Sequence, residues 1–548
     1  MTVHQPFTVT AARLFDGSEV LAATHLRVAE GRIDAIGGSE IIGHDDALIS
    51  GGTLLPGLID AHVHLLPGCT QLAATFGVTT VIDQFSKPDV IDSERAAIAA
   101  ALAGAGPARA DLRTSSIGAT APNGHPTMAY APIPYVTGPG DAPRFVEARI
   151  AEGATHLKVI YDDGSGAMLN IASLDPATIE ALVIAAHRHG LPVVAHVSTA
   201  AGAVTVARCG VDVLAHVPFE RMREAEVRDV AQTGVALIAT LSLVDGFPNA
   251  DGGMPLLGEP GLAARLSPRW RRVLDGQSRR WMPPPPDGAA ARENTLALFQ
   301  SGVRVLAGTD APNPGLVFGA SLHRELQHLV DAGLPPTEAL RAATATPADV
   351  FEMPDRGRLR IGSRADIVLV NGDPTADITA TQHLRTIWVA GRDPAPETYS
   401  GSTAEREAIT ALRETTNKIV AAIQDSWPDF PTPEDVHRDD GELLGRLIPT
   451  SGGWQATTTF GAALGAITTR DEAFDTVLGQ GLAALAETWW VQPLDARNWH
   501  EATLVEVEPD RLRLRWKDPM VDQPPSGQWY HRDDINLSRT RPDEPNGS

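Results

Sequence analysis

Two histidines, His62 and His64, lie one residue apart in the stretch PGLIDAHVHL, which spans residues 56–65. The stretch is short and mostly apolar, which is typical of a buried β-strand. Side chains alternate between the two faces of a strand, so both imidazoles share one face while Val63 takes the other. Two neutral imidazoles on one face could bind one metal cation. They could also be two surface histidines on a half-exposed strand, and the rest of the chain has to decide.

Further metal-competent side chains occur late in other apolar runs: Lys158 in THLKVIYDDG, His196 in PVVAHVST, His216 in DVLAHVPF and Asp310 in VLAGTDAP. Side chains at this end of the strands of a (β/α)8 barrel emerge at its catalytic face. Lys158 and His196 are 38 residues apart and His196 and His216 are 20 apart, so each interval fits one strand–helix unit. The interval from His64 to Lys158 fits three units, and that from His216 to Asp310 fits two units and an insertion.

The elements that must position these residues are compact apolar runs that end in polar or Gly-rich segments. They lie at residues 58–65, 77–85, 110–118, 154–164, 191–199, 211–219, 234–242 and 302–312. Alanine-rich segments suited to helices lie between them; in residues 174–190, Asp175 is a suitable N-cap, Pro176 stands at the first helical position and Gly190 follows the last turn. Eight such units predict an α/β fold with a (β/α)8 TIM-type barrel. A doubly wound open sheet is the alternative, but no Gly-rich phosphate-binding turn follows a strand.

Short β-branched segments with Gly turns precede this region and return after it. We predict one composite β-sandwich built from residues 1–56 and 357–398, on both flanks of a barrel at residues 57–356. An unusually long connection, residues 243–292, follows the seventh predicted strand. Connections of this length are usually lids or binding loops. A surface excursion without a catalytic role is the alternative.

The pattern changes after residue 398. We predict a helical and linker region at residues 399–480, with residues 450–485 part strand and part helix, and a small β module at residues 481–548. The module resembles SH3 or Tudor barrels. Its aromatic residues, Trp499, Trp516, Trp529 and Tyr530, could fill a core or bind a ligand.

Several motifs together resemble one family. GLIDAHVHL, LKVIYDDG, VVAHVST, DVLAHV and AGTDAP, followed by ALRAATATPADVF and DRGRLRIGSRADIVLV, are similar to the amidohydrolase superfamily, and in particular to its imidazolonepropionase-like and prolidase-like metal-dependent hydrolases. The resemblance runs in order through residues 7–393 and does not extend to the last part of the chain. It implies a hydrolase that depends on divalent metal, with zinc as the expected ion.

The resemblance also implies a ligand set. His62, His64 and Asp310 would hold one metal, His196 and His216 a second, and carboxylated Lys158 would bridge the two. A free ammonium has no lone pair for a cation, whereas its carbamate offers two oxygens, and burial favours the reactive neutral amine. Some members use one metal, held by His62, His64, His196 and Asp310, while His216 polarises the substrate. Lys158 would then be a snorkelling or substrate-binding lysine.

The implied reaction is hydrolysis of a C–N amide bond, including cyclic amides and dipeptide-like compounds. A metal-activated hydroxide would attack, and Asp310 would act as general base and then general acid, with His216 or a metal polarising the carbonyl. Deamination and ester or lactone hydrolysis on the same fold are alternatives. A non-catalytic scaffold that acts through the C-terminal module is a further alternative, disfavoured because every expected ligand position is filled.

Two residues could contact the substrate's carboxylate or carbonyl. His125, in NGHP, follows the third strand, and Tyr161 follows Lys158 on its loop. A structural histidine and a packing tyrosine are the alternatives. Arg324, on the segment after the eighth strand, is a weaker candidate.

Composition restricts the partners. The chain has 45 Lys and Arg against 68 Asp and Glu, a net charge of −23, which argues against nucleic acid or an anionic membrane as partner. Two cysteines cannot build a disulfide framework, and the sequence shows neither a signal peptide nor a run of 18 apolar residues. We therefore expect a cytoplasmic enzyme with a small-molecule substrate. A homo-oligomer would be in keeping with the resembling enzymes.

Overall fold

The structure is a computed structural model that describes residues 5–164, 171–249, 252–278, 286–426, 431–494, 496, 498–508, 511–518 and 523–542. The chain divides into two compact units. The first contains residues 1–248, 254–265 and 285–422, and the second contains residues 249–253, 266–284 and 423–548. Within the described part, no helix combines the length and the apolar character that crossing a membrane requires.

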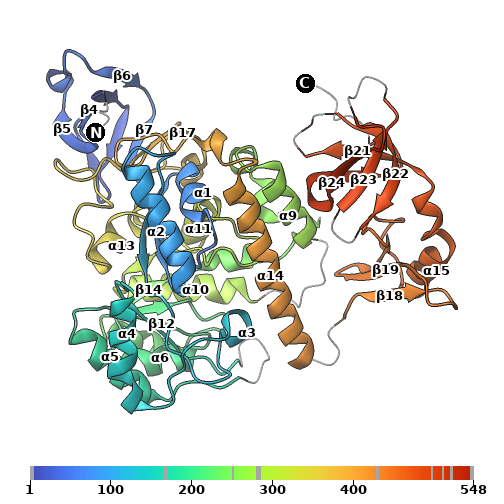
Figure 1. The fold of residues 1–548 in the computed structure, drawn as a ribbon. Helices are drawn as coiled ribbons and strands as arrows, with labels where there is room; N and C mark the ends of the chain where they lie inside the picture. The colour runs from blue at the N-terminus through green and yellow to red at the C-terminus, as the bar shows by residue number, and fades with distance from the viewer. Residues whose placement is uncertain are drawn as a thin grey trace. The chain divides into compact units, whose positions relative to one another are not determined.

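All eight predicted strands are present in the first unit, in two parallel sheets, of which Figure 1 labels β12 and β14. They are β8 (Leu58–Val63), β9 (Val78–Asp83), β10 (Asp111–Thr114), β11 (Leu157–Ile160), β12 (Val193–His196), β13 (Val213–Ala215), β14 (Ala236–Ile238) and β15 (Val305–Leu306). One sheet has the order β10-β9-β8 and the other β11-β12-β13-β14-β15, with parallel pairing throughout. The chain is therefore a mixed α/β protein.

Single backbone bridges connect the two sheets at both of their ends. Val63 pairs with Ala311 beyond β15, and Ala119 beyond β10 pairs with Val159. The amide of Ala119 donates to the carbonyl of Lys158 at 2.8 Å, and the amide of Asp310 donates to the carbonyl of His62 at 2.8 Å. These bridges place β8 beside β15 and β10 beside β11.

Gly308 permits one of these close approaches. A Cβ atom at this position would lie 2.5 Å from Cγ2 of Ile238 and 2.9 Å from the backbone nitrogen of His62. We expect Gly308→Ala to lower the free energy of unfolding by about 1–3 kcal/mol, because neighbouring backbone must shift. Gly140→Ala is the matched control, since no atom lies within 4 Å of its added Cβ. Denaturant unfolding that gives equal losses for both variants would show that the packing at Gly308 is not tight.

Helices alternate with these strands. The principal ones are α1 (Cys69–Thr75), α2 (Pro88–Leu102), α3 (Thr127–Tyr130), α4 (Ala142–Ala151), α5 (Pro176–His187), α6 (Ala200–Arg208), α7 (Glu224–Ala231), α10 (Gly288–Gln300), α11 (Ala320–Asp331), α12 (Pro336–Ala342) and α13 (Ala345–Val350). Helix α5 begins as predicted, because the Asp175 side chain accepts the amide of Thr178 at 2.7 Å. It packs beside β11 and β12 (Figure 1).

The flanks form two further sheets, one from the N-terminal flank alone and one from both flanks. Strands β1 (Phe7–Thr10), β4 (His25–Ala29), β5 (Arg32–Gly37) and β6 (Ala47–Ser50) form one sheet, in the order β5-β4-β1-β6. Strands β2 (Arg13–Phe15), β3 (Val20–Leu21), β7 (Thr53–Pro56), β16 (Ile367–Val370) and β17 (Leu384–Trp388) form the other, in the order β17-β16-β7-β2-β3. Val9, Leu26, Leu54, Leu369 and Trp388 belong to one buried cluster, so the two flanks share a core.

The long connection is structured over its described residues. It contains the 3₁₀ segments η4 (Leu241–Gly246) and η5 (Pro255–Gly258), and helices α8 (Pro260–Ala263) and α9 (Pro268–Ser278). Helix α9 belongs to the second unit, where Arg269 pairs with Asp534 at 2.9 Å. The connection is therefore divided between the two units.

The second unit is rich in antiparallel strands, shown in orange and red in Figure 1. Helix α14 (Thr403–Ser426) leads into it. It contains β18 (Glu434–His437), β19 (Leu443–Thr450), β20 (Gly453–Thr458), α15 (Arg470–Gln480), β21 (Thr488–Pro493), β22 (His500–Val507), β23 (Arg511–Trp516), β24 (Gln528–His531) and β25 (Ile535–Ser538). The sheets have the orders β18-β19-β20 and β24-β23-β22-β21-β25. Residues of both sheets, among them Leu447 and Leu514, belong to one buried cluster.

One feature of the second unit differs in detail from the sequence-based expectation. Strands β18 and β19 lie where the sequence predicted helix and linker. Trp516 is buried and donates its indole N–H to the Tyr530 hydroxyl at 3.2 Å, so these two aromatics contribute to the packing of the module.

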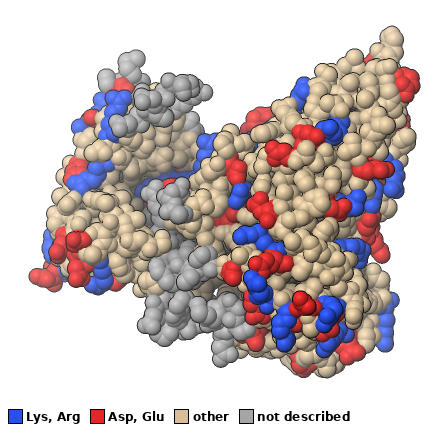
Figure 2. Space-filling view, turned by 180° about the vertical axis from the view of Figure 1, so that it is seen from behind, with Lys and Arg blue, Asp and Glu red and all other residues tan. Residues whose placement is uncertain are grey.

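On the face shown in Figure 2, acidic and basic side chains are interspersed, so among the coloured residues there the net negative charge is not gathered into one patch.

Candidate metal centre

The six predicted ligand residues all lie at the carboxyl ends of parallel strands. His62 is in β8 and Lys158 is in β11, while His196 is the last residue of β12. His64, His216 and Asp310 follow the ends of β8, β13 and β15 within a few residues. Because the bridges described above join the two sheets, these strand ends surround one small volume.

Distances confirm that the side chains meet. Potential ligand atoms of His62, His216 and Asp310 all lie within 4.8 Å of one another. Asp310 Oδ1 is 3.0 Å from Nε2 of His64 and 3.4 Å from Nε2 of His62. Nδ1 of His196 is 3.1 Å from Nε2 of His216. Two nitrogens that share a tetrahedral zinc at about 2.1 Å would be separated by a similar distance, about 3.4 Å.

Hydrogen bonds orient the rings of three histidines. Nδ1 of His64 donates to the carbonyl of Phe85 at 3.0 Å, so Nε2 is the ring nitrogen that faces the cluster, 3.0 Å from Asp310 Oδ1. Although burial lowers the pKa of His64, the hydrogen bond to Asp310 and the charge of Asp310 raise it on balance. Nδ1 of His216 donates to the Thr240 hydroxyl at 2.8 Å, because that hydroxyl itself donates to the carbonyl of Ala239. Nε2 of His216 is therefore left as a free acceptor, as a metal ligand requires, whereas Nε2 of His64 would bind a metal in place of the proton that it shares with Asp310.

His196 uses the opposite nitrogen. Its Nε2 lies 3.3 Å from Asp162 Oδ2, and the Ser198 hydroxyl donates to the other oxygen of Asp162 at 2.8 Å. Although burial raises the pKa of Asp162, the hydrogen bond and charge of His196, together with hydrogen bonds from the Gly164 amide and the Ser198 hydroxyl, outweigh it and hold that pKa well below its ordinary value. The ionised carboxylate accepts the Nε2 proton, so Nδ1 of His196 keeps its lone pair toward His216.

Unsatisfied buried atoms show that the cluster fits a cation. Both ring nitrogens of His62 and Nζ of Lys158 are buried and make no hydrogen bond. A buried polar group without a partner costs about 1–3 kcal/mol. Burial, followed by the charge of Lys158, lowers the pKa of His62 well below its ordinary value, so the ring is neutral and can bind metal. The residues present therefore suit a divalent metal, as the sequence predicted.

Lys158 is buried in a tightly packed setting. Its residue exposure is 1%, and burial lowers its pKa to about 7. Gly118 makes room for the side chain, since a Cβ atom there would lie 3.0 Å from Cγ of Lys158 and 2.8 Å from Cδ2 of Phe85. Near neutral pH a large fraction of the amine is unprotonated, which is the form that can react with carbon dioxide.

Backbone strain accompanies the cluster. His216 has φ of +76° and Asp310 has φ of +62°, both in the left-handed region that non-glycine residues rarely adopt. Thr240, the hydrogen-bond partner of His216, has φ of +50°. Strained residues of this kind gather at functional sites and persist where the surrounding structure holds them.

Asp60, which was not predicted as a site residue, supports the cluster from behind. Its carboxylate accepts the Thr309 hydroxyl at 2.7 Å, the Thr309 amide at 3.0 Å and the His62 amide at 3.2 Å. Burial raises the pKa of Asp60 to about 7. An aspartate within the apolar run LIDAHVHL was the available signal, because a buried carboxylate needs partners.

The two predicted substrate contacts, His125 and Tyr161, lie in different places: the His125 ring lies against His196, and the Tyr161 ring lies beside helix α6. The ring of His125 stacks on that of His196, with centroids 4.7 Å apart and planes at 27°, and burial lowers the pKa of His125 to about 3. Tyr161 donates its amide to the carbonyl of His196, and its ring lies beside Gly202 in the first turn of α6. Arg324, the weaker candidate, has its guanidinium engaged by Asp245 and Glu259.

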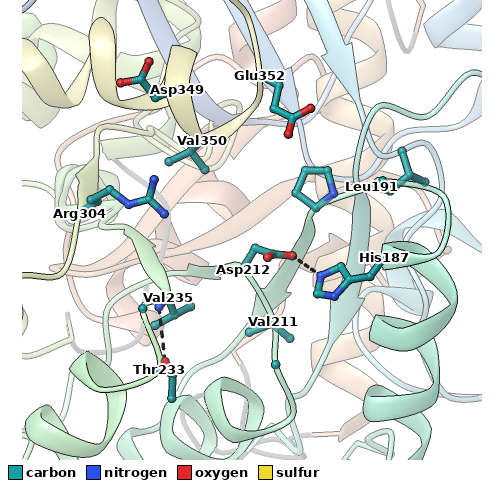
Figure 3. A pocket seen from close by; sticks show the side chains of 14 residues that line it. His187, Leu191, Val211, Asp212, Thr233, Val235, Arg304, Asp349, Val350 and Glu352 are labelled. Carbon is teal, nitrogen blue, oxygen red and sulfur yellow. Dashed lines mark hydrogen bonds and ion pairs between the residues drawn. The ribbon is translucent and has the colours of Figure 1, made fainter.

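A pocket lies at the amino ends of the strands, opposite the metal centre (Figure 3). Residues that precede β12, β13, β14 and β15 line it, together with the end of α13. Asp212 there accepts the Val193 amide at 2.7 Å and pairs with His187 at 2.8 Å, as the dashed line in Figure 3 shows. These contacts tie α5 to the start of two strands, which is a structural role.

The chain belongs to the amidohydrolase family, whose model matches residues 53–392, more than half of the sequence. This confirms the family that the motifs predicted. Ochratoxinase of Aspergillus niger is 27% identical over 274 residues, which is 48% of this chain and 50% of that protein. Imidazolonepropionase of Deinococcus deserti is 36% identical over 99 residues, which is 17% of this chain and 24% of that protein. The match to ochratoxinase thus spans about half of its length.

Solved structures share the fold. A Xaa-Pro dipeptidase crystallised with methionine superposes with a TM-score of 0.56 at 21% identity, covering 71% of this chain and 99% of that one. The crystal structure of Aspergillus niger ochratoxinase gives a TM-score of 0.54 at 20% identity, covering 73% and 96%. At these identities the likeness concerns the fold.

Proposed function

We propose that this chain is a metal-dependent hydrolase that cleaves a C–N amide bond, open or cyclic, of a small molecule. One observation carries the proposal: four histidines and Asp310 converge beside the buried amine of Lys158, and hydrogen bonds leave a lone pair of His196 and one of His216 facing the cluster. The names of two similar proteins support cleavage of a C–N bond, since an imidazolonepropionase and a Xaa-Pro dipeptidase act on such bonds. The two parallel sheets are, in this proposal, parts of one closed eight-stranded barrel.

Each ligand residue has a proposed place. His62, His64 and Asp310 would hold one ion, and His196 and His216 a second, with carboxylated Lys158 between them; zinc suits this set of nitrogens and oxygens. A divalent metal bound there would lower the pKa of a coordinated water and polarise a carbonyl.

The chain's own residues would then move the proton. Oδ1 of Asp310 lies within 3.4 Å of both Nε2 atoms of the HxH pair, so it faces the reacting volume. It would accept a proton from the attacking water and pass it to the leaving nitrogen. Asp60 and Thr309 would keep His62 in place during this transfer. His125, stacked on His196, and Tyr161 remain the proposed substrate contacts.

The rest of the sequence-based assignment stays a proposal. It comprises the sandwich at residues 1–56 and 357–398, the barrel at 57–356, the region at 399–480 and the SH3- or Tudor-like module at 481–548. It also comprises a small-molecule substrate, no nucleic acid or membrane partner, and a homo-oligomeric assembly.

A substrate screen tests the reaction. The protein loaded with Zn²⁺ would be given N-acyl amino acids, dipeptides, lactams and lactones, with release of amine and carboxylate as the readout. We expect turnover of at least one amide class. Turnover of lactones alone would replace the amide assignment by ester hydrolysis, and metal-free protein that takes up no ion on titration would overturn the proposal.

Metal counting separates the two-ion centre from the one-ion centre. We expect close to two equivalents per chain by elemental analysis, because the six converging side chains are more than one tetrahedral ion needs. Native mass spectrometry should show an addition of about 44 Da on Lys158, as carboxylation of a ligand lysine would give. One equivalent without this addition would favour a mononuclear deaminase or cyclic-amide hydrolase.

A further inference from the structure

Helix α11 holds both ends of the short segment η4, which follows β14. Near the start of η4, Glu325 accepts the Ser242 amide at 2.6 Å. Near its end, Asp245 accepts two hydrogen bonds from Arg324, at 2.9 and 3.1 Å, and one from Nε2 of His328, at 3.0 Å. Three side chains of one helix therefore fix η4.

The residue before η4 contacts the metal centre. Thr240 is fully buried with φ of +50°, and its hydroxyl accepts from Nδ1 of His216. The direction of the Thr240 hydroxyl depends on the strained turn from Thr240 to Ser242. Glu325 holds this turn through the Ser242 amide, and the Ser242 hydroxyl holds it by donating to the carbonyl of Thr309 at 3.3 Å. A continuous set of contacts thus runs from α11 to His216.

The burial of the Glu325 carboxyl group carries a cost in free energy. Its exposure is 0%, and its Oε1 makes no hydrogen bond. Arg324 and His328 already anchor the start of the long connection through Asp245, and Arg324 also pairs with Glu259. A buried carboxyl group is costly unless its contacts offset the loss of hydration. What Glu325 adds is the position of the Ser242 amide, two residues from Thr240.

We propose that Glu325 is a positioning residue of the metal centre, which through the turn at Thr240 holds His216 in the tautomer that presents Nε2 to a divalent metal. The inference rests on the proposed function only in taking His216 as a metal ligand. In this inference, Thr240 and Glu325 help to set the metal affinity of the site formed by His196 and His216.

The test measures metal binding directly, with Zn²⁺ or Co²⁺ as the probe and a competing chelator. Loss of such an outer hydrogen bond typically weakens metal binding 10- to 100-fold. We expect Thr240→Val to weaken binding of the second metal ion by about 10- to 100-fold. Thr240→Ser, which keeps the hydroxyl, should bind this ion as the wild type does. The visible spectrum of the Co²⁺-loaded protein should change in Thr240→Val and not in Thr240→Ser.

Glu325 needs a matched control. Glu405 is also 0% exposed and also accepts one backbone amide, that of Gly401, at 2.6 Å. We expect Glu325→Ala to weaken the second equivalent about tenfold or more, Glu325→Gln to retain most of the affinity, and Glu405→Ala to leave it unchanged. Circular dichroism of each variant checks folding, and if Glu325→Ala does not fold, Thr240→Val and Glu325→Gln decide.

The outcomes separate this inference from the proposed function. If the wild-type protein binds neither Zn²⁺ nor Co²⁺, the proposed function is wrong. If the wild type binds two equivalents and Thr240→Val binds both as tightly, with an unchanged Co²⁺ spectrum, the positioning role is wrong while the hydrolase proposal stands. The same holds if Glu325→Ala and Glu405→Ala differ only in melting temperature and not in metal affinity.

Discussion

Replacing Asp310 by Asn should lower kcat by about 10²- to 10⁴-fold, the range that loss of a general acid–base residue typically gives. The carboxylate is the one proposed ligand that can take a proton during the reaction and return it, and an amide cannot. Metal content should stay close to that of the wild type, because His62, His64, His196 and His216 remain. The measurements are steady-state kinetics on the substrate found in the screen and elemental analysis of the same preparation.

The fold should tolerate this substitution. Asp310 has φ of +62°, and Asn is among the few residues enriched in that conformation. Its backbone amide, which donates to the carbonyl of His62, is unchanged. Asp212→Asn is the control, because Asp212 lies at the opposite strand ends (Figure 3). If Asp310→Asn turned over at near-normal rates, Asp310 would not be the proton acceptor.

Replacing Lys158 by Met should have two opposite effects. Turnover should fall at least about a hundredfold, because metal-centred charge stabilisation is worth several kcal/mol and each 1.36 kcal/mol changes the rate tenfold. The metal-free protein should become more stable, because a buried amine without a hydrogen bond is replaced by an apolar chain of similar length. Thermal unfolding with chelator present, beside kinetics with metal, measures both.

The stability gain should depend on pH in a defined direction. The folded-state pKa of Lys158 is about 7, below the ordinary value of 10.5. Between these values the unfolded chain binds a proton that the folded chain lacks, so the stability of metal-free wild type rises with pH across this window, by on the order of 5 kcal/mol. Below pH 7 the folded amine is charged and the full penalty applies. Lys158→Met lacks this rise, so its advantage should shrink from pH 7 to 10; a constant advantage would mean that Lys158 is not buried as described.

The strand-end residues could be predicted because their signals are local. Alternation along a strand places His62 and His64 on one face, and the ends of parallel strands place Lys158, His196 and Asp310 together. The eight runs that became strands carried the same local pattern. This is why the ligand set could be proposed before any distance was known.

The supporting residues could not be predicted in this way. Thr240 and Glu325 are 85 residues apart in the sequence, and neither carries a motif. Arg324 pointed toward a substrate role because it follows the eighth strand, but its direction on α11 is set by Asp245 and Glu259 in a connection with no regular pattern. Strands β18 and β19 lie in an acidic, proline-rich stretch, where pairing and a shared core overcame weak local preference.

The sheet β17-β16-β7-β2-β3 has a consequence for how the chain is made. Strand β7 pairs with β16, whose residues follow it by more than 300 positions, so the ribosome must synthesise the whole intervening region before β7 gains this neighbour. Until then, β7 presents an open apolar edge, which is a hazard for aggregation. A nascent chain stopped before residue 367 should therefore depend on chaperones, while one stopped after residue 388 should not.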